Sequence, residues 1–237
     1  MIKEALQYIV GLRKPEVISV NGVDYCDKVL NHISYNPKAE PIEMTTLTSL
    51  VDYISSNIDT MSDKMIVHVV SPTKVELYSS LDNERLREKL VVVNANVPSF
   101  PFDKFIDSEK FLIGLQSKFI PTDDRELLLK FAGTVETGTV QNYGDDGITQ
   151  KATIKTGPAS KSDAKVPSPC TLQPFRTFNE VEQPESEFIF RMQDGLHSVE
   201  CAIFEADGGS WKNEAMKNIK EYFEDHLSDY SNFTVIS

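Results

Sequence analysis

The spacing of apolar residues along the last third of the sequence is the feature that most restricts its fold. Apolar and polar residues alternate in two successive stretches, which is typical of strands with one buried face. The alternating apolar residues are Phe188, Phe190, Met192, Val199, Cys201 and Ile203. Apolar residues then recur at helical spacing at Ala215, Ile219 and Phe223, with Trp211 before them on the same stripe. We therefore expect a strand pair followed by a helix, with Trp211 as a buried anchor of the core.

The earlier part of the sequence repeats this mixture of patterns. Residues 65–70 form a strongly β-prone run, and residues 90–93 form a shorter one. Helical stripes begin near Ser108 and near Asp123. Together these patterns predict an α+β fold in which a mixed or antiparallel sheet packs against several helices.

Two hairpins are expected in addition to these elements. Residues 16–27 contain Asn21-Gly22 between β-prone residues, and this pair favours a tight turn. Residues 135–155 are rich in threonine and poor in large apolar residues, which predicts a hairpin that projects from the core.

These expectations divide the chain into three regions. The sequence has 237 residues, of which 40% are hydrophobic, so it is long enough for a substantial core. We expect residues 1–134 to form the N-terminal α+β part of that core and residues 170–237 to complete it. Residues 135–169 are expected to form the projecting hairpin and a mobile loop.

The net charge of −12 restricts the classes of partner. Nucleic-acid and anionic-lipid surfaces attract clustered lysine and arginine, so neither is expected as a partner. No apolar run is long enough to span a bilayer. Cys26, Cys170 and Cys201 are far apart and lack metal-ligand spacing, which favours reduced thiols in a cytoplasmic protein.

Two pairs of carboxylates could form a metal site. Tyr143-Gly144-Asp145-Asp146 matches a hairpin motif of RNA-dependent polymerases, in which the two acids hold Mg²⁺, but the chain is too short for such an enzyme. We expect a simple turn here instead, with Gly147 and Gly195 in tight hairpin turns and no metal. Glu205 and Asp207, before the last helix, are the second pair, and a tight turn is the alternative there.

Arg176 and Arg191 flank an acidic segment, and two interpretations of them remain open. One is recognition of a carboxylate or phosphate by the planar guanidinium group. The other is structural ion pairing within the sheet. The four histidines lie in unrelated contexts and form no triad by spacing, so we predict no catalytic residue, metal or cofactor.

Several segments resemble an uncharacterised protein family of tailed phages and prophages. The segments that carry the resemblance are Leu115-Gln116-Ser117, Asp145-Asp146-Gly147, Pro174-Phe175-Arg176-Thr177-Phe178 with Glu180, Gln183-Pro184, and Phe204-Glu205-Ala206-Asp207-Gly208-Gly209 with Trp211-Lys212. The resemblance implies a phage-encoded protein that acts in the host cytoplasm. It implies no reaction.

The sequence thus predicts a binding protein without catalytic activity, which forms homo-oligomers and acts on a host or phage protein, for example as an inhibitor of a host defence factor. The alternatives are a metal-dependent enzyme that uses the carboxylate pairs and a structural assembly protein. Residues 180–230 carry thirteen acids and four bases, whereas residues 149–176 carry five bases and one acid. We expect self-association between these stretches. The lysines that would contribute are Lys151, Lys155, Lys161 and Lys165.

Overall fold

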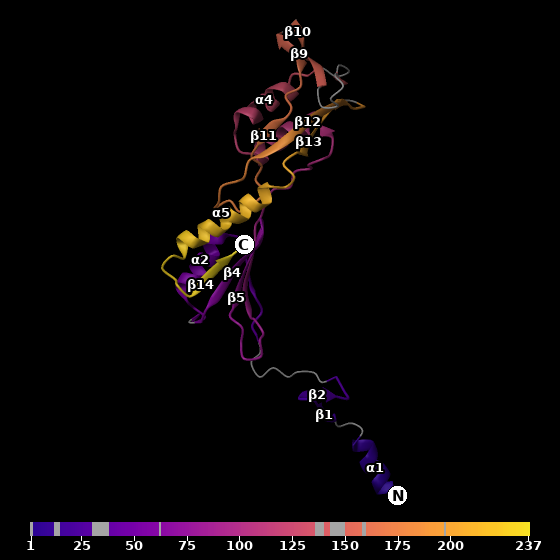
Figure 1. Cartoon of the computed structure of the whole chain (residues 1–237). Coiled ribbons are helices and arrows are strands. Elements are labelled where there is room, and N and C mark those ends of the chain that lie inside the picture. The colour runs from indigo at the N-terminus through magenta and orange to yellow at the C-terminus, as the bar shows by residue number, and fades with distance from the viewer. Residues whose placement is uncertain are drawn as a thin grey trace. The chain divides into compact units, whose positions relative to one another are not determined.

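The computed structural model describes residues 2–11, 15–29, 38–61, 63–135, 140–142, 150–157, 160–196 and 198–237. The chain divides into an N-terminal unit, Met1–Lys38, and a main unit, Ala39–Ser237. Within the described ranges there are five helices, together with antiparallel and mixed sheets, so the predicted α+β class is confirmed (Figure 1). The boundaries expected after residues 134 and 169 stay a prediction.

The N-terminal unit contains one helix and one hairpin. Helix α1 spans Ile2–Gly11, and strands β1 (Val17–Val20) and β2 (Val23–Cys26) pair in antiparallel fashion. Asn21 and Gly22 join the strands with φ angles of 53° and 79°. Both residues therefore adopt the left-handed conformation that a two-residue hairpin turn requires, as the sequence predicts.

The main unit begins with a five-stranded sheet in the order β14-β4-β5-β6-β3. Its strands are β3 (Ile42–Met44), β4 (Met65–Ser71), β5 (Lys74–Ser79), β6 (Lys89–Asn94) and β14 (Phe233–Ile236). Helices α2 (Leu47–Ser56) and α5 (Trp211–His226) bury their apolar stripes with one face of this sheet in a first hydrophobic cluster. Thr46 caps α2 by accepting a hydrogen bond from the Ser49 amide at 3.2 Å, which fixes the start of the helix.

A carboxylate lies on the other face of this sheet. Glu76 is 5% exposed, and its Oε1 lies 2.8 Å from the Nζ atoms of both Lys74 and Lys89. The Tyr78 hydroxyl donates a hydrogen bond to Oε2 of the same carboxylate. Burial raises the pKa of Glu76, but the hydrogen bonds from the two lysines and Tyr78 outweigh burial and hold the pKa at about 2.

This carboxylate should make stability depend on pH in acid. The pKa of Glu76 in the folded chain lies below its ordinary value of 4.5, so the carboxylate stabilises the fold above pH 4.5 and loses this contribution as the pH falls toward 2. In urea unfolding at a series of acidic pH values, the wild type should lose more stability than the Glu76→Gln variant. Equal losses in the two proteins would show that the ion pairs do not stabilise the fold.

The second part of the main unit is built on a sheet in the order β11-β12-β13-β7. Its strands are β7 (Ile106–Asp107), β11 (Cys170–Leu172), β12 (Ser186–Asp194) and β13 (Val199–Glu205). Helices α3 (Ser108–Lys118) and α4 (Asp123–Ala132) pack on it in a second hydrophobic cluster. Phe190 of β12 is fully buried there and stacks on Phe111 of α3, with ring centroids 5.5 Å apart.

The predicted hairpin, residues 135–155, contains β8 and the start of β9 in a third sheet of the order β10-β9-β8, and the stretch after it, where we expected a mobile loop, forms the strand β10. Its strands are β8 (Gln141–Asn142), β9 (Gln150–Gly157) and β10 (Ser160–Lys165). The hairpin is not supported by its own strands alone, because Ala152 and the following Val166 are buried in the second cluster. The Gln150 side chain also accepts from the Met192 amide at 2.9 Å and donates to the Met192 carbonyl at 3.0 Å, which joins this sheet to β12.

A linking segment, residues 173–184, connects the two clusters. Phe178 is buried in the first cluster, whereas Leu172, just before the segment, is buried in the second. The Thr177 hydroxyl donates to the Pro72 carbonyl, and Glu180 accepts from the Leu47 amide at 2.8 Å. Contacts with the first sheet and with the start of α2 thus hold the segment in place. The segment in turn positions Arg176, which lies at the centre of the candidate site.

Candidate functional site

The candidate site is built around Arg176 in the linking segment. Gln183 fixes the backbone here, because its Oε1 accepts from the amides of Arg176 at 2.9 Å and Thr177 at 3.1 Å. The Gln183 amide group donates in turn to the Phe178 carbonyl at 2.8 Å. Gln183 is 3% exposed. Its buried side chain therefore pairs with backbone amides of residues that lie outside helices and strands.

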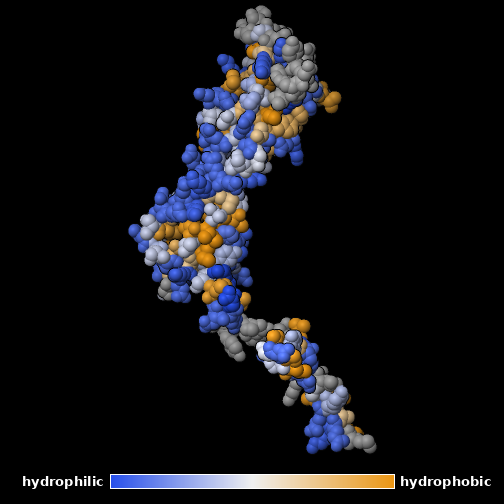
Figure 2. Space-filling view, in the orientation of Figure 1, coloured by the Kyte–Doolittle hydropathy of each residue, from blue (hydrophilic) through white to orange (hydrophobic). Residues whose placement is uncertain are grey.

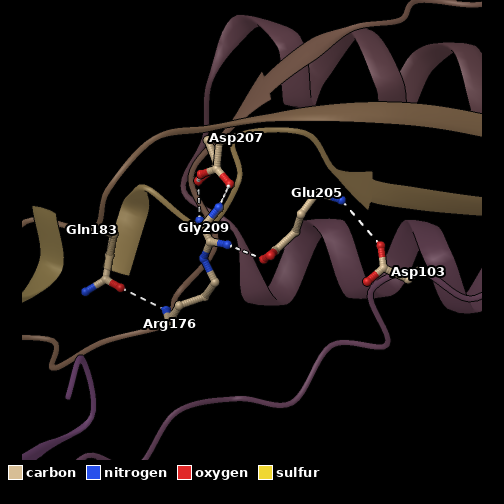
Figure 3. Close-up of polar contacts among 7 residues, drawn as sticks. Asp103, Arg176, Gln183, Glu205, Asp207 and Gly209 are labelled. Atoms are coloured by element: carbon tan, nitrogen blue, oxygen red, sulfur yellow. Dashed lines mark hydrogen bonds and ion pairs between the residues drawn. The ribbon is translucent and has the colours of Figure 1, made fainter. Parts of the chain in front are cut away.

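The Arg176 guanidinium connects three parts of the main unit. Its Nη1 donates to Oε1 of Glu205, at the end of β13, over 2.6 Å (Figure 3). Its Nη2 donates to the hydroxyl of Ser186, at the start of β12. Its Cζ atom lies 3.9 Å from the ring centroid of Trp211, the first residue of α5, and 5.6 Å from the ring centroid of Phe188. The Arg176 side chain is buried, and it makes an ion pair with Glu205 and a cation–π contact with Trp211.

Asp207 completes the cluster in the loop before α5. Its Oδ2 accepts from the Ser186 hydroxyl at 2.7 Å, and its Oδ1 accepts from the Gly209 amide at 2.9 Å. Gly208 and Gly209 have φ angles of 65° and 80°, which lets the loop turn back toward the carboxylate. Burial raises the pKa of Asp207, but the hydrogen bonds from Ser186 and Gly209 and the charge of Arg176 hold it below its usual range.

The charges of this cluster are matched internally. Burial lowers the pKa of Arg176, and the negative charges of Glu205 and Asp207 oppose that effect. Because arginine stays protonated in proteins, the group carries one positive charge between two carboxylates. An incoming carboxylate or phosphate would meet Nη atoms that already donate to Glu205 and Ser186. The arrangement is therefore suited to hold β12, β13 and α5 together rather than to bind an anion.

Three of the four residues predicted for ligand or partner binding meet in this cluster, and the fourth does not. Arg191 lies further along β12, at a pocket of about 370 Å³. The pocket is also lined by Phe105 and Phe204, whose rings meet edge to face with centroids 6.0 Å apart. Sequence analysis missed Ser186 and Gln183, because a serine and a glutamine in an acidic stretch carry no distinctive signal.

Of the two carboxylate pairs considered for a metal site, the structure describes only Glu205 and Asp207. Glu205 and Asp207 each bind a partner from the Arg176 cluster. Across the described ranges, no group of three or more histidine, cysteine, aspartate or glutamate residues could hold a metal ion. Asp145, Asp146 and the predicted turn at Gly147 lie outside these ranges.

The second predicted glycine turn is visible. Gly195 lies between β12 and β13, and its amide donates to the Ser198 carbonyl at 2.9 Å. A Cβ atom at residue 195 would lie 2.7 Å from the same carbonyl oxygen, so the close approach of the two strands requires glycine here.

The two buried cysteines of the main unit are poorly suited to act as nucleophiles. Cys170 and Cys201 are buried, and burial, with smaller effects of Asp124 and Glu187 on Cys170 and of Asp107 on Cys201, raises the pKa of each thiol to about 12. Cys26 is exposed in the N-terminal hairpin. Low-pKa thiolates are what cysteine enzymes use, so the two buried thiols act as small apolar core residues.

The lysines predicted for self-association lie opposite one another in the third sheet. Lys151 is the register partner of Lys165, and Lys155 is the partner of Lys161. The acids of the last helix are partly matched already, by the pairs Lys217–Glu221 at 3.4 Å and Lys220–Glu224 at 3.7 Å.

Trp211 differs from its prediction as a fully buried core anchor. Ala215, Ile219 and Phe223 are fully buried, but Trp211 is half-buried and lies under the Arg176 guanidinium. The helical stripe is thus correct, but its first residue lies beyond the first cluster, at the level of the linking segment. Because the indole is only half-buried, replacing Trp211 by alanine should cost less than the same change at a fully buried aromatic residue.

Comparison of the chain with protein-family models, with curated proteins and with solved structures finds no match in any of the three. No helix among the described residues is long and apolar enough to cross a membrane.

Proposed function

We propose that this chain is a non-enzymatic binding protein that associates with further copies of itself through its N-terminal unit. One observation carries the proposal: the N-terminal unit Met1–Lys38, taken by itself, buries none of its described side chains, although many are large and apolar. The exposed apolar residues are Ile2, Leu6, Tyr8, Ile9, Val10, Val17, Ile18, Val20, Val23, Tyr25 and Val29. An exposed apolar surface of this kind marks an interaction site.

The hairpin of this unit has two unlike faces. In its register, Ile18 pairs with Tyr25 and Val20 pairs with Val23, so these four residues share one side, which we name the hairpin's apolar face. The other side carries Val17, Ser19, Asp24 and Cys26. A two-stranded hairpin is marginally stable alone in water, and cover over its apolar face would stabilise it. Figure 2 shows apolar surface over this hairpin.

Helix α1 has the same two-sided character. Ile2, Leu6 and Ile9 follow one another at helical spacing and lie on one stripe, whereas Lys3, Glu4 and Gln7 occupy the opposite side. A helix of ten residues is too short to be stable by itself, so packing of its apolar stripe is what would hold it.

The distribution of charge favours a second copy as the partner. Met1–Lys38 carries five bases and four acids, which gives a net charge of +1. Because the whole chain has a net charge of −12, Ala39–Ser237 carries a net charge of −13. Two main units repel each other, whereas the N-terminal unit can approach a main unit without that repulsion. Charge therefore favours association that involves the N-terminal unit over association of two main units.

The enzyme alternative has less support. Glu205 and Asp207 are occupied by Arg176 and Ser186, and the buried thiols have raised pKa values. An assembly protein with exchanged N-terminal units is one form of the proposed function. The phage origin and cytoplasmic location that the sequence resemblance implies remain predictions, as does a host protein as a further partner.

The proposal is tested by the mass of the chain in solution. Light scattering on the wild type at rising concentration should give a mass above that of one chain. Ile18→Lys places a charge on the hairpin's apolar face and should return the mass to one chain. Ser19→Lys is the matched control, because it adds the same charge to the next residue on the opposite face and there lies beside its register partner, Asp24.

The control should associate as the wild type does. A wild type with the mass of one chain at every concentration would overturn the proposal. Equal behaviour of Ile18→Lys and Ser19→Lys would show that association, where present, does not use the hairpin's apolar face.

A further inference from the structure

Each sheet of the main unit ends in two edge strands, whose outer backbone groups can pair with a further strand unless something prevents it. The edges are β14 and β3 in the first sheet, β11 and β7 in the second, and β10 and β8 in the third. Three of these edges are poor templates for pairing. Strands β7 and β8 are only two residues long, and β10 contains Lys161 and Lys165, whose charges discourage an added strand.

Of the other three edges, β3 and β11 are protected and β14 is not. Strand β3 follows Pro41 and contains the exposed Glu43. In β11, the Thr171 amide already donates to Oδ2 of Asp124 at 2.6 Å. Strand β14, Phe233–Ile236, has no proline, no charged residue and no irregularity in its register with β4. Among the described edge strands of the main unit, β14 is therefore the best template for a further strand (Figure 1).

The register of β14 shows which of its backbone groups face outward. The strand runs parallel to β4, and the Met65 amide donates to the Asn232 carbonyl at 2.8 Å. In a parallel ladder, alternate residues of a strand bond to the same neighbour. Asn232 and Thr234 therefore bond to β4, whereas Phe233 and Val235 direct their backbone groups to the outer side.

Three backbone groups on this outer side are available to an added strand. The Phe233 amide donates to the Tyr230 carbonyl at 3.1 Å, so it is already used. The Phe233 carbonyl and the N–H and C=O of Val235 have no hydrogen-bond partner among the described residues. The rings of Tyr230 and Phe233 pack against the first cluster with centroids 6.4 Å apart, and they would lie beside every second side chain of an added strand.

We propose that the outer edge of β14 binds an extended, basic segment of another protein, which adds to the first sheet as a further strand. In this mode of recognition, main-chain hydrogen bonds supply affinity, and alternate side chains of the segment supply specificity. The site lies wholly within the main unit. It is independent of self-association through the N-terminal unit and so goes beyond the proposed function.

Charge selects a basic segment rather than β14 of a second copy. Residues 221–237, which lead into β14 and include it, contain four acids and no lysine or arginine. Two of these acids pair with lysines of α5, whereas Asp225 and Asp229 are exposed and pair with no described base. Two main units, each with a net charge of −13, would repel each other across this edge, but lysine or arginine in the segment would be attracted to it. Because β14 itself is uncharged, the segment should be apolar at its centre and basic at its ends.

The experiment follows the Val235 amide of the full chain by nuclear magnetic resonance while a peptide is added. The probe is the peptide Lys-Val-Thr-Val-Thr-Val-Lys with blocked ends, and its matched control has glutamate in place of both lysines. A saturating amount of the basic peptide should slow hydrogen exchange of the Val235 amide by about tenfold or more, because this amide gains a hydrogen bond. The Thr234 amide, which already bonds to β4, should change far less, and the acidic peptide should bind much more weakly.

Two substitutions of one residue separate the backbone from the side chain. Val235→Pro removes the outward N–H but no bond to β4, and an edge strand tolerates proline at such a position. It should weaken binding of the basic peptide by about tenfold or more, through the lost hydrogen bond and the blocked edge. Val235→Ala keeps the N–H and should bind within about threefold of the wild type. Circular dichroism and melting report whether Val235→Pro folds, and if it does not, exchange of the Val235 amide in the wild type decides alone.

Several results would overturn the inference. Unchanged exchange of the Val235 amide in excess basic peptide would show that nothing adds to this edge. Equal binding of the basic peptide by folded Val235→Pro and by Val235→Ala would place the contact elsewhere, and equal binding of the two peptides would remove the argument from charge. Protection of the Val235 amide that rises with protein concentration in the absence of peptide would show that a second copy occupies the edge.

Discussion

Replacing Arg176 by alanine is expected to lower the free energy of unfolding by about 3–5 kcal/mol, the range for removing one partner of a buried ion pair. The guanidinium is 7% exposed and donates to both Glu205 and Ser186 while it covers Trp211. Its loss leaves Glu205 and Asp207 close together without the positive charge between them. The three parts of the main unit that meet at this residue then lose their common partner.

Chemical denaturation followed by circular dichroism measures this loss. Lys212→Ala is the control, because Lys212 also lies near Trp211, at 5.8 Å from the ring centroid, but is exposed. Removal of an exposed charge usually changes stability by less than about 0.5 kcal/mol. If Arg176→Ala were no more destabilising than Lys212→Ala, the cluster would not hold the main unit together, and a role in binding would become the better explanation of it.

Phe190→Ala should be equally damaging, at about 3–5 kcal/mol, because it empties a fully buried aromatic site. Phe190 has no exposed surface and stacks on Phe111, so its removal leaves a cavity between β12 and α3. The second cluster is held by a few such rings, and neighbouring side chains that are themselves fully buried cannot fill the space without moving the strands.

Ile189→Ala is the comparison for this prediction. Ile189 is the preceding residue on the same strand, but its side chain points to the other face of the sheet and is half-buried. The same unfolding measurement should show a clearly smaller loss for Ile189→Ala. Equal losses would contradict the assignment of β12 faces that the alternating pattern predicts.

The second cluster was readily predicted from the sequence, because its strands alternate. Phe188, Phe190 and Met192 all lie on the buried face. In the first cluster, the four-residue spacing of Ala215, Ile219 and Phe223 likewise marks the buried stripe of α5. These patterns are local, so a single strand or helix is enough to reveal them.

The Arg176 cluster could be predicted only in part. Arg176 and Glu205 are 29 positions apart in the sequence, and nothing local states that they form a pair. The role of Ser186 depends on the strand order, which brings the start of β12 beside the end of β13. The sequence predicts correctly that Trp211 lies on the apolar stripe of α5, but not how much of its side chain is buried. Burial of a helix's first turn depends on how far the neighbouring sheet extends.

The division of the chain after Lys38 was not among the boundaries predicted from the sequence. Its helix and hairpin have the same patterns as core elements, so the sequence favours their inclusion in one core with residues 39–134. An apolar face predicts that something covers it, but it does not specify whether the cover belongs to the same chain or to another copy.

Hydrogen exchange of the β1 and β2 amides at a series of protein concentrations is the most direct test of self-association through the N-terminal unit. A hairpin that is marginal alone exchanges quickly, and one that is covered by a second copy is protected. We predict that protection of residues 17–26 rises with concentration in the wild type and in Ser19→Lys, and stays absent in Ile18→Lys. Protection that is independent of concentration, or absent at every concentration in the wild type, would contradict the account.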